Sequence, residues 1–214
     1  MTQVEDDEFA WNKYPQHRKW FNKLYVAEQM GYRCGPCGVA PSEPGKYVVR
    51  PIYNLSGMGL GASVKTIKAG DYSEVPPGYF WCEYFTGSHY SATYKFNHDV
   101  KGTWEMQSCW VGYTQEEALY KFDKWIRSSY APAVPRIFNQ LSDVQYINVE
   151  FIADNPIEVH LRKSPDPDYD ELVPAWKYHN RHTNHFLTNG YKFVPAYENA
   201  DGFLTNPRTG FWVK

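Results

Sequence analysis

Short runs of hydrophobic residues, several of them alternating with polar ones, predict a chain rich in strands. Segments dense in β-branched and aromatic side chains, or apolar at every second position, are typical of strands. The predicted strands cover residues 47–52, 64–67, 79–85, 89–97 and 103–113. Turn-forming residues such as Pro76-Pro77-Gly78 separate these segments.

Two other stretches carry their hydrophobic residues at helical spacing. They cover residues 16–30 and 114–129, and the second begins with a capping box at Thr114. We expect an irregular lead-in over residues 1–15. Residues 164–214 are rich in proline, asparagine and aromatic residues, and predict loops with a few short strands.

Glycine occupies every second position between the first two predicted strands, in the sequence Ser56-Gly57-Met58-Gly59-Leu60-Gly61. Such a hairpin tip lets backbone N–H groups approach a phosphate closely. Arg50, at the end of the preceding strand, would add a fixed positive charge. The alternative is a glycine-rich hairpin loop without a ligand. It is neither a Walker loop nor a dinucleotide fingerprint, because no Gly-Lys-Ser/Thr and no helix follow it.

Residues 145–163 alternate with a period of two and predict a second hairpin, with its turn at residues 153–156. One face carries Ile147, Val149, Phe151, Ile157, Val159 and Leu161. If the two strands pair, the opposite face gathers Asn148, Glu150, Glu158, His160 and Arg162. Two carboxylates beside an imidazole and an amide are plausible ligands of a hard cation. The alternative is an amphipathic hairpin whose polar face lies in water.

Two further patterns are typical of metal or redox sites. Cys34-Gly35-Pro36-Cys37 has thioredoxin-type spacing, but the residues after it cannot form the helix that this chemistry needs. Cys82 and Cys109 are isolated and complete no zinc site, so we interpret the cysteines as structural or incidental. The spacing His179-x-x-His182-x-x-His185 leaves metal binding open beside a plain polar loop.

Composition narrows the class of protein. A net charge of −2 does not favour nucleic acid as a partner. No apolar run approaches the ~18 residues of a membrane span, and the acidic N-terminus lacks the apolar region of a signal peptide. We therefore expect a soluble, cytoplasmic protein with reduced thiols and no membrane partner. Aromatic residues make up 18%, which suits binding clefts as well as cores.

The order of these parts resembles the ATP-grasp superfamily from Phe21 to Arg162. Val48-Val49-Arg50-Pro51 before the glycine loop is similar to the family's strand that ends in Lys-Pro. The segment Cys82-Glu83-Tyr84-Phe85-Thr86-Gly87-Ser88-His89 resembles its hinge, Glu-Glu-Tyr-Ile-x-Gly-x-Glu. Glu150, followed by Glu158-Val159-His160-Leu161-Arg162, resembles its acid followed by Glu-x-Asn-x-Arg. The helix that bears Lys23 resembles the family's lysine-bearing helix.

The resemblance implies an α+β fold, with two α+β lobes whose antiparallel sheets grip a nucleotide between them. It implies one unit over residues 1–214. The parts would be an N-terminal lead and helix (1–45), a glycine-loop lobe (46–85), a metal-binding lobe (86–163) and a C-terminal extension of unknown role (164–214).

The same resemblance implies a site. ATP would be bound by Lys23, Arg50, Ser56, Gly57, Gly59, Gly61, Glu83, Tyr84, Phe85 and His89. Magnesium, with manganese as a substitute, would be held by Glu150, Glu158 and His160. Arg50 and Arg162 would serve catalysis, in which a small-molecule or peptide carboxylate attacks the γ-phosphate and an amine opens the resulting acylphosphate to an amide.

Three positions depart from the family pattern: Arg50 stands for a lysine, His160 for an asparagine and His89 for an acid. We expect no counterpart of the N-terminal domain usual in the family, because the glycine loop begins within the first 60 residues. This suggests a minimal enzyme, a subunit whose partner replaces that domain, or a degenerate nucleotide binder. Short chains of this kind resemble phage-encoded ATP-grasp proteins, which would place the protein in a host cytoplasm. A viral structural or interaction module, suggested by the aromatic excess, is the remaining alternative.

Overall fold

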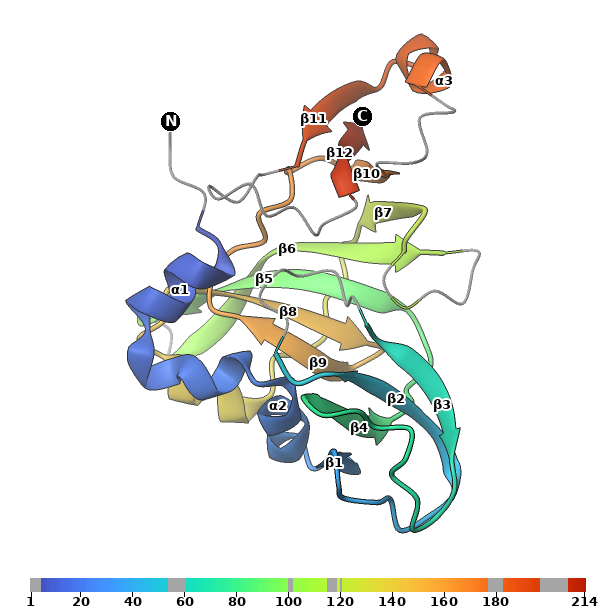
Figure 1. The fold of residues 1–214 in the computed structure, drawn as a ribbon. Coiled ribbons are helices and arrows are strands. Elements are labelled where there is room, and N and C mark those ends of the chain that lie inside the picture. The colour runs from blue at the N-terminus through green and yellow to red at the C-terminus, as the bar shows by residue number, and fades with distance from the viewer. Residues whose placement is uncertain are drawn as a thin grey trace.

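The computed structural model describes residues 5–53, 61–99, 102–114, 119, 121–176, 183–196 and 208–214. Within them, two antiparallel sheets and a few short helices form a mostly β, α+β structure, which confirms the predicted fold class (Figure 1). No described helix has the length and apolar character to cross a membrane.

The smaller sheet has the strand order β1-β4-β2-β3 and is seen at the bottom of Figure 1. Its strands are β1 (Cys34–Pro36), β2 (Gly45–Pro51), β3 (Ser63–Ile67) and β4 (Tyr79–Glu83). The predicted pairing of the two strands around the glycine loop is confirmed, because Val48 lies opposite Val64 in an antiparallel register. The glycine-containing tip of that hairpin, residues 54–60, lies outside the described residues.

The larger sheet has the order β11-β12-β10-β7-β6-β5-β8-β9. Its strands are β5 (His89–Asn97), β6 (Thr103–Tyr113), β7 (Lys124–Arg127), β8 (Tyr146–Ile152), β9 (Asn155–His160), β10 (Glu171–Trp176), β11 (Lys192–Pro195) and β12 (Arg208–Val213). Strands β5 and β6 have the predicted bounds, and β8 pairs with β9 as predicted. The C-terminal strands extend the far edge, in agreement with the few short strands expected there.

Among the described residues, five short helical segments accompany the sheets: α1 (Asp7–Lys13), the 3-10 helices η1 (Pro15–Phe21) and η2 (Arg136–Leu141), α2 (Lys23–Gln29) and α3 (Thr183–Thr188). Helix α2 contacts β9 of the larger sheet and β1 and β4 of the smaller one. The main core lies between the N-terminal helices and the larger sheet, and Ile147, Val149 and Phe151 are fully buried there, on the face the alternation predicted.

The prediction of one continuous helix over residues 16–30 is wrong in its middle. Asn22 is extended, and its side chain accepts a hydrogen bond from Tyr25 N at 2.9 Å, so it caps α2. Asparagine is a favoured N-cap because its side chain replaces a missing backbone partner. The result is a 3-10 turn followed by a new helix, and it places Lys23 in the first turn of α2.

The helix predicted over residues 114–129 is also wrong in the part that can be checked. Lys124–Arg127 is strand β7, which pairs with both β6 and β10. Trp125 and Ile126 suit a strand as well as a helix, and pairing between two strands overrides the helical spacing. Residues 115–117 of the capping box lie outside the described residues.

The irregular lead-in expected over residues 1–15 is wrong as well, because it contains α1. Asp6 caps this helix by accepting a hydrogen bond from Phe9 N at 2.6 Å. Ala10, one turn after Asp7, and Tyr14 are both buried in the main core. The helix therefore fixes Asp7 against the body of the protein.

Candidate active site

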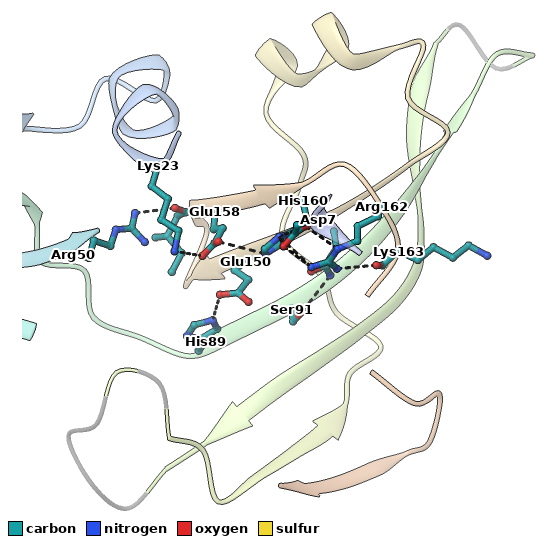
Figure 2. A network of polar contacts seen from close by, with 12 residues as sticks. Asp7, Lys23, Arg50, His89, Ser91, Glu150, Glu158, His160, Arg162 and Lys163 are labelled. Carbon is teal, nitrogen blue, oxygen red and sulfur yellow. Dashed lines mark hydrogen bonds and ion pairs between the residues drawn. The ribbon is translucent and has the colours of Figure 1, made fainter. Parts of the chain in front are cut away.

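The polar face of the β8–β9 hairpin lies inside the protein. Asn148 is paired with His160 and Glu150 with Glu158, so the four side chains share one face as predicted. Glu158 and His160 are only 9% and 6% exposed, because the N-terminal segment and α2 pack over β9. The alternative of a polar face in water therefore does not hold for β9 (Figure 2).

Lys23 and Arg50 contact this hairpin from elements outside the larger sheet. Lys23, in the first turn of α2, is 3% exposed and forms an ion pair with Glu158 at 3.0 Å. Arg50, near the end of β2, donates from Nη2 to the Ile157 carbonyl at 2.8 Å. A strand of the smaller sheet, a helix and the edge of the larger sheet thus bring two cations and two carboxylates together (Figure 2).

Arg50 differs from Lys23 in having no counter-charge. Among the described residues, no carboxylate lies within ion-pair distance of Arg50, and its buried Nε has no hydrogen-bond partner. The guanidinium lies over the Phe80 ring, with 5.1 Å between Cζ and the ring centroid, and the residue is only 9% exposed. A buried charge is costly unless it is paired, so this position is suited to an anionic ligand.

Glu150 is paired with His89, whose Nε2 lies 3.3 Å from Glu150 Oε2. His89 itself packs edge-on against the rings of Phe122 and Trp125. Burial raises the pKa of the Glu150 carboxyl, but His89, His160 and Lys23 together outweigh burial and hold the pKa at about 2. Glu150 is therefore an anion at neutral pH, and about a third of its side chain is still exposed (31%).

His160 and Arg162 both contact Asp7 of α1. His160 Nδ1 lies 3.0 Å from Asp7 Oδ1, and Arg162 places Nε 2.8 Å from Oδ1 and Nη2 2.9 Å from Oδ2. Burial raises the pKa of Asp7, but His160 and Arg162 more than offset this and hold it well below its usual value. Burial lowers the pKa of His160, and the Asp7 carboxylate reverses this, so the pKa is raised overall. Asp7 is therefore the ion-pair partner of Arg162 in this structure, and Nη2 donates the hydrogen bond between them.

Comparison with known proteins gives matches in structure alone. No protein-family model matches the sequence, and a search of curated proteins found no relative. The fold is similar to N5-carboxyaminoimidazole synthetase from Staphylococcus aureus complexed with ADP, with a TM-score of 0.55 and 11% identity, over 93% of this chain and 68% of that one. It is also similar to L-amino acid ligase from Bacillus licheniformis, with a TM-score of 0.52 and 10% identity, over 92% of this chain and 67% of that one. The fold is thus similar to that of ATP-grasp domains.

A protein from Archaeoglobus fulgidus assigned to the ATP-grasp superfamily matches with a TM-score of 0.46 and 9% identity, over 92% of this chain. This chain spans only 64% of the length of that protein. The two matches with TM-scores of 0.52 and 0.55 show the similarity of fold over most of this chain, and about a third of each of those neighbours lies outside the aligned part.

The hinge residues expected from the ATP-grasp pattern lie where β4 leaves the smaller sheet. The Glu83 carboxylate accepts a hydrogen bond from Arg33 N at 3.1 Å, and Phe85 packs edge-on against Tyr32, with ring centroids 4.7 Å apart. Tyr84 is 39% exposed. The Glu83 carboxylate is thus committed to Arg33.

The glycine loop is described only at its end. Ser56, Gly57 and Gly59 lie outside the described residues. Gly61 has a φ of +82°, and a Cβ there would lie 2.6 Å from the Tyr79 hydroxyl, so this position needs glycine.

The carboxylates of the β8–β9 hairpin would suit a metal ion whose other ligands are supplied by a bound nucleotide. No three His, Cys, Asp or Glu side chains in the described part of the chain are arranged to hold a metal ion by themselves. Magnesium, however, is usually held by one or two carboxylates together with phosphate oxygens and water. The facing pair Glu150 and Glu158 supplies that donor set. Of the three histidines proposed from spacing, His179 and His182 lie outside the described residues.

Asp7 is the member of this cluster that the sequence analysis missed. It lies in a segment taken as irregular, and the family pattern begins later in the chain. One signal was present: an aspartate before a short helical segment is a typical N-cap, and Asp6 is that residue. A helix starting there would have placed Asp7 on the same face as Ala10, which is buried.

The CxxC segment has the structure expected of an inactive pair of thiols. Cys34 is in strand β1 opposite Cys82, and none of the four cysteines forms a disulfide. Burial, with a smaller contribution from Glu28, raises the pKa of Cys34 to about 11, and burial raises that of Cys82 to about 12. A redox-active thiol instead needs a lowered pKa.

We therefore expect Cys34 to react slowly with iodoacetamide at pH 8, and its rate to rise as the pH approaches 11, because the thiolate is the nucleophile. Mass spectrometry of the alkylated peptide measures this rate. Changing both Cys34 and Cys37 to serine should leave nucleotide binding within a few-fold of the original. Reduction of insulin disulfides at thioredoxin-like rates would contradict this assignment.

Proposed function

We propose that the protein is an ATP- and magnesium-dependent ligase that joins a carboxylate to an amine through an acylphosphate. The observation that carries the proposal is Arg50, a buried cation without a described carboxylate partner, beside the facing carboxylates Glu150 and Glu158. In an ATP-grasp fold, this combination provides for both the anion and its metal.

The neighbours support the same class of chemistry. One is an L-amino acid ligase, and the synthetase with the higher TM-score was solved with ADP. From these neighbours we infer only the general class of reaction, an ATP-dependent ligation with a small-molecule or peptide carboxylate and an amine as substrates. The same proposal includes a partner subunit that supplies the part of the neighbours without a counterpart in this chain. It also includes the division of residues 1–214 into four parts.

Each residue then has a task that its position allows. Arg50 and the glycine loop, with Ser56, Gly57, Gly59 and Gly61, would hold phosphates, and Lys23 would share its charge between Glu158 and the nucleotide. The backbone of Glu83, Tyr84 and Phe85 would bind adenine, and His89 would orient Glu150 near the ribose. These contacts serve positioning and charge neutralisation, which dominate catalysis of phosphoryl transfer.

Glu150 and Glu158, with His160 beside them, would hold the metal. Magnesium supplies charge neutralisation at the transferred phosphoryl group when it is bound. A substrate carboxylate oxygen attacks the γ-phosphorus and ADP leaves. The amine nitrogen then attacks the acyl carbon, phosphate leaves, and the nitrogen loses a proton. Arg162 would bind the carboxylate or the acylphosphate, for which it must exchange or share its contact with Asp7.

A second candidate function is nucleotide binding without turnover. The specific observation that favours it is that Arg162 and Lys23 already have buried carboxylate partners, Asp7 and Glu158. Both functions predict that MgATP raises the melting temperature, because a ligand that binds only the native state stabilises it. ADP release that requires both a carboxylate and an amine separates the ligase from the simple binder.

A further inference from the structure

Asp7 links two functional side chains through one buried carboxylate. Its two oxygens lie 3.0 and 3.1 Å from His160 Nδ1, and the same oxygens pair with Nε and Nη2 of Arg162. The residue is 4% exposed, and Ala10 and Tyr14 anchor this end of the chain in the main core. Asp7 is thus built into the cluster that Figure 2 shows.

The contact with Asp7 determines which ring nitrogen of His160 can bind a metal ion. An ionised carboxylate can only accept hydrogen bonds, so His160 Nδ1 must be the donor. Nε2 is then the nitrogen on the far side of the ring, and it lies 3.6 Å from Glu158 Oε1. A carboxylate that binds one imidazole nitrogen, and so presents the other, is the usual arrangement behind a metal-ligating histidine.

We propose that Asp7 is a positioning residue, which presents His160 Nε2 to the cation bound by Glu158 and so makes the site prefer a divalent transition metal over magnesium. The inference rests on the proposed function, since this cation is the one that accompanies the nucleotide. Magnesium favours oxygen ligands, whereas imidazole suits transition metals better. Because His160 stands in place of the asparagine of the family pattern, the donor set combines carboxylate oxygens with an imidazole nitrogen.

Mn²⁺ with ADP on the full chain is the probe that tests this directly. Electron spin echo spectroscopy detects a nitrogen nucleus coupled to bound Mn²⁺, and the loss of the free Mn²⁺ resonance gives its affinity. Competition with Mg²⁺ in the same titration gives the preference between the two metals. We expect nitrogen coupling in the wild type and its loss in His160→Asn.

Asp7→Ala should weaken Mn²⁺ binding by about 10- to 100-fold, the usual effect of removing an outer carboxylate, with little change for Mg²⁺. Asp7→Asn keeps an acceptor for Nδ1 and should restore part of the loss. Glu8→Ala is the matched control, because it removes an exposed carboxylate from the same helix and should change neither affinity. If Asp7→Ala does not fold, Asp7→Asn must still lower the Mn²⁺ to Mg²⁺ preference.

The outcomes separate the two proposals. A wild-type protein that binds neither metal in the presence of ADP overturns the proposed function and this inference with it. Metal binding without nitrogen coupling overturns the inference alone. Unchanged coupling and an unchanged metal preference in both Asp7 variants would show that Asp7 only supports the fold, and would also overturn it.

Discussion

Glu150→Gln is expected to abolish ATP turnover while the fold is retained. The change keeps the shape of the side chain but removes a negative oxygen ligand from the cation that holds the nucleotide phosphates. Removing a residue that hydrogen-bonds a metal ligand typically lowers metal affinity or activity by about 10- to 100-fold. Removing a direct ligand should lower activity by at least as much. The measurement is ADP release in the presence of an active pair of acceptors.

Glu158→Gln should also abolish turnover, but with a cost in stability. Glu158 is the ion-pair partner of Lys23, and breaking a buried pair by removing one member typically costs about 3–5 kcal/mol. If the two facing carboxylates merely repelled each other, both variants would be more stable; the structure gives each its own partner instead, Lys23 for Glu158 and His89 for Glu150. Chemical denaturation distinguishes these cases.

Glu74→Gln is the control for both variants, since Glu74 forms an exposed pair with Lys65 that should contribute at most about 1 kcal/mol. It should turn over like the wild type. Wild-type turnover in both Glu150→Gln and Glu158→Gln would leave the hairpin as a buried polar face without catalytic use, and the ligase proposal would fall.

Arg50→Ala is expected to remove most of the stabilisation that MgATP gives to the protein. A charge-assisted contact to phosphate is worth about 1.5–3 kcal/mol, which corresponds to a roughly 10- to 150-fold loss of affinity. A ligand at 100 times its Kd stabilises the native state by about 2.7 kcal/mol, and at that concentration such a loss of affinity should reduce the stabilisation to about 0.3–1.4 kcal/mol. The measurement is the melting temperature with and without MgATP.

The shift must be taken relative to each variant without ligand, because Arg50 also contacts Ile157 and the Phe80 ring. Arg50→Lys should retain binding, since a point charge also serves phosphate. Arg127→Ala is a matched control, because this arginine is paired with Asp168 and Asp170 at the surface. An unchanged ATP-induced shift in Arg50→Ala would remove Arg50 from the nucleotide site.

The sequence predicted the parts of the site that depend on local pattern. Alternation placed Glu150 and Glu158 on the same face of the second hairpin, and the structure pairs them directly. The same reasoning left open whether that face is wet or buried, because burial depends on what packs over it. Helix α2 and the N-terminal segment pack over β9. The alternation of polar and apolar residues cannot predict such a tertiary contact.

The errors have one cause, which is that short segments take their structure from their neighbours. Residues 124–127 form a strand because two other strands pair with them. The helix over residues 16–30 breaks where Asn22 gains a cap, and α1 holds Asp7 against Arg162 across 155 positions of sequence. Propensity is a weak prior in such segments, and tertiary contacts decide.

The central claim is that the protein couples ATP cleavage to the joining of a carboxylate and an amine. A screen of amino acids and small acids with amines for stimulated ADP release, followed by identification of the product by mass spectrometry, tests it most directly. We predict ADP release that needs both partners and matches the amide formed one to one. Stabilisation by MgATP without ADP release for any pair would contradict the claim and leave a nucleotide-binding protein.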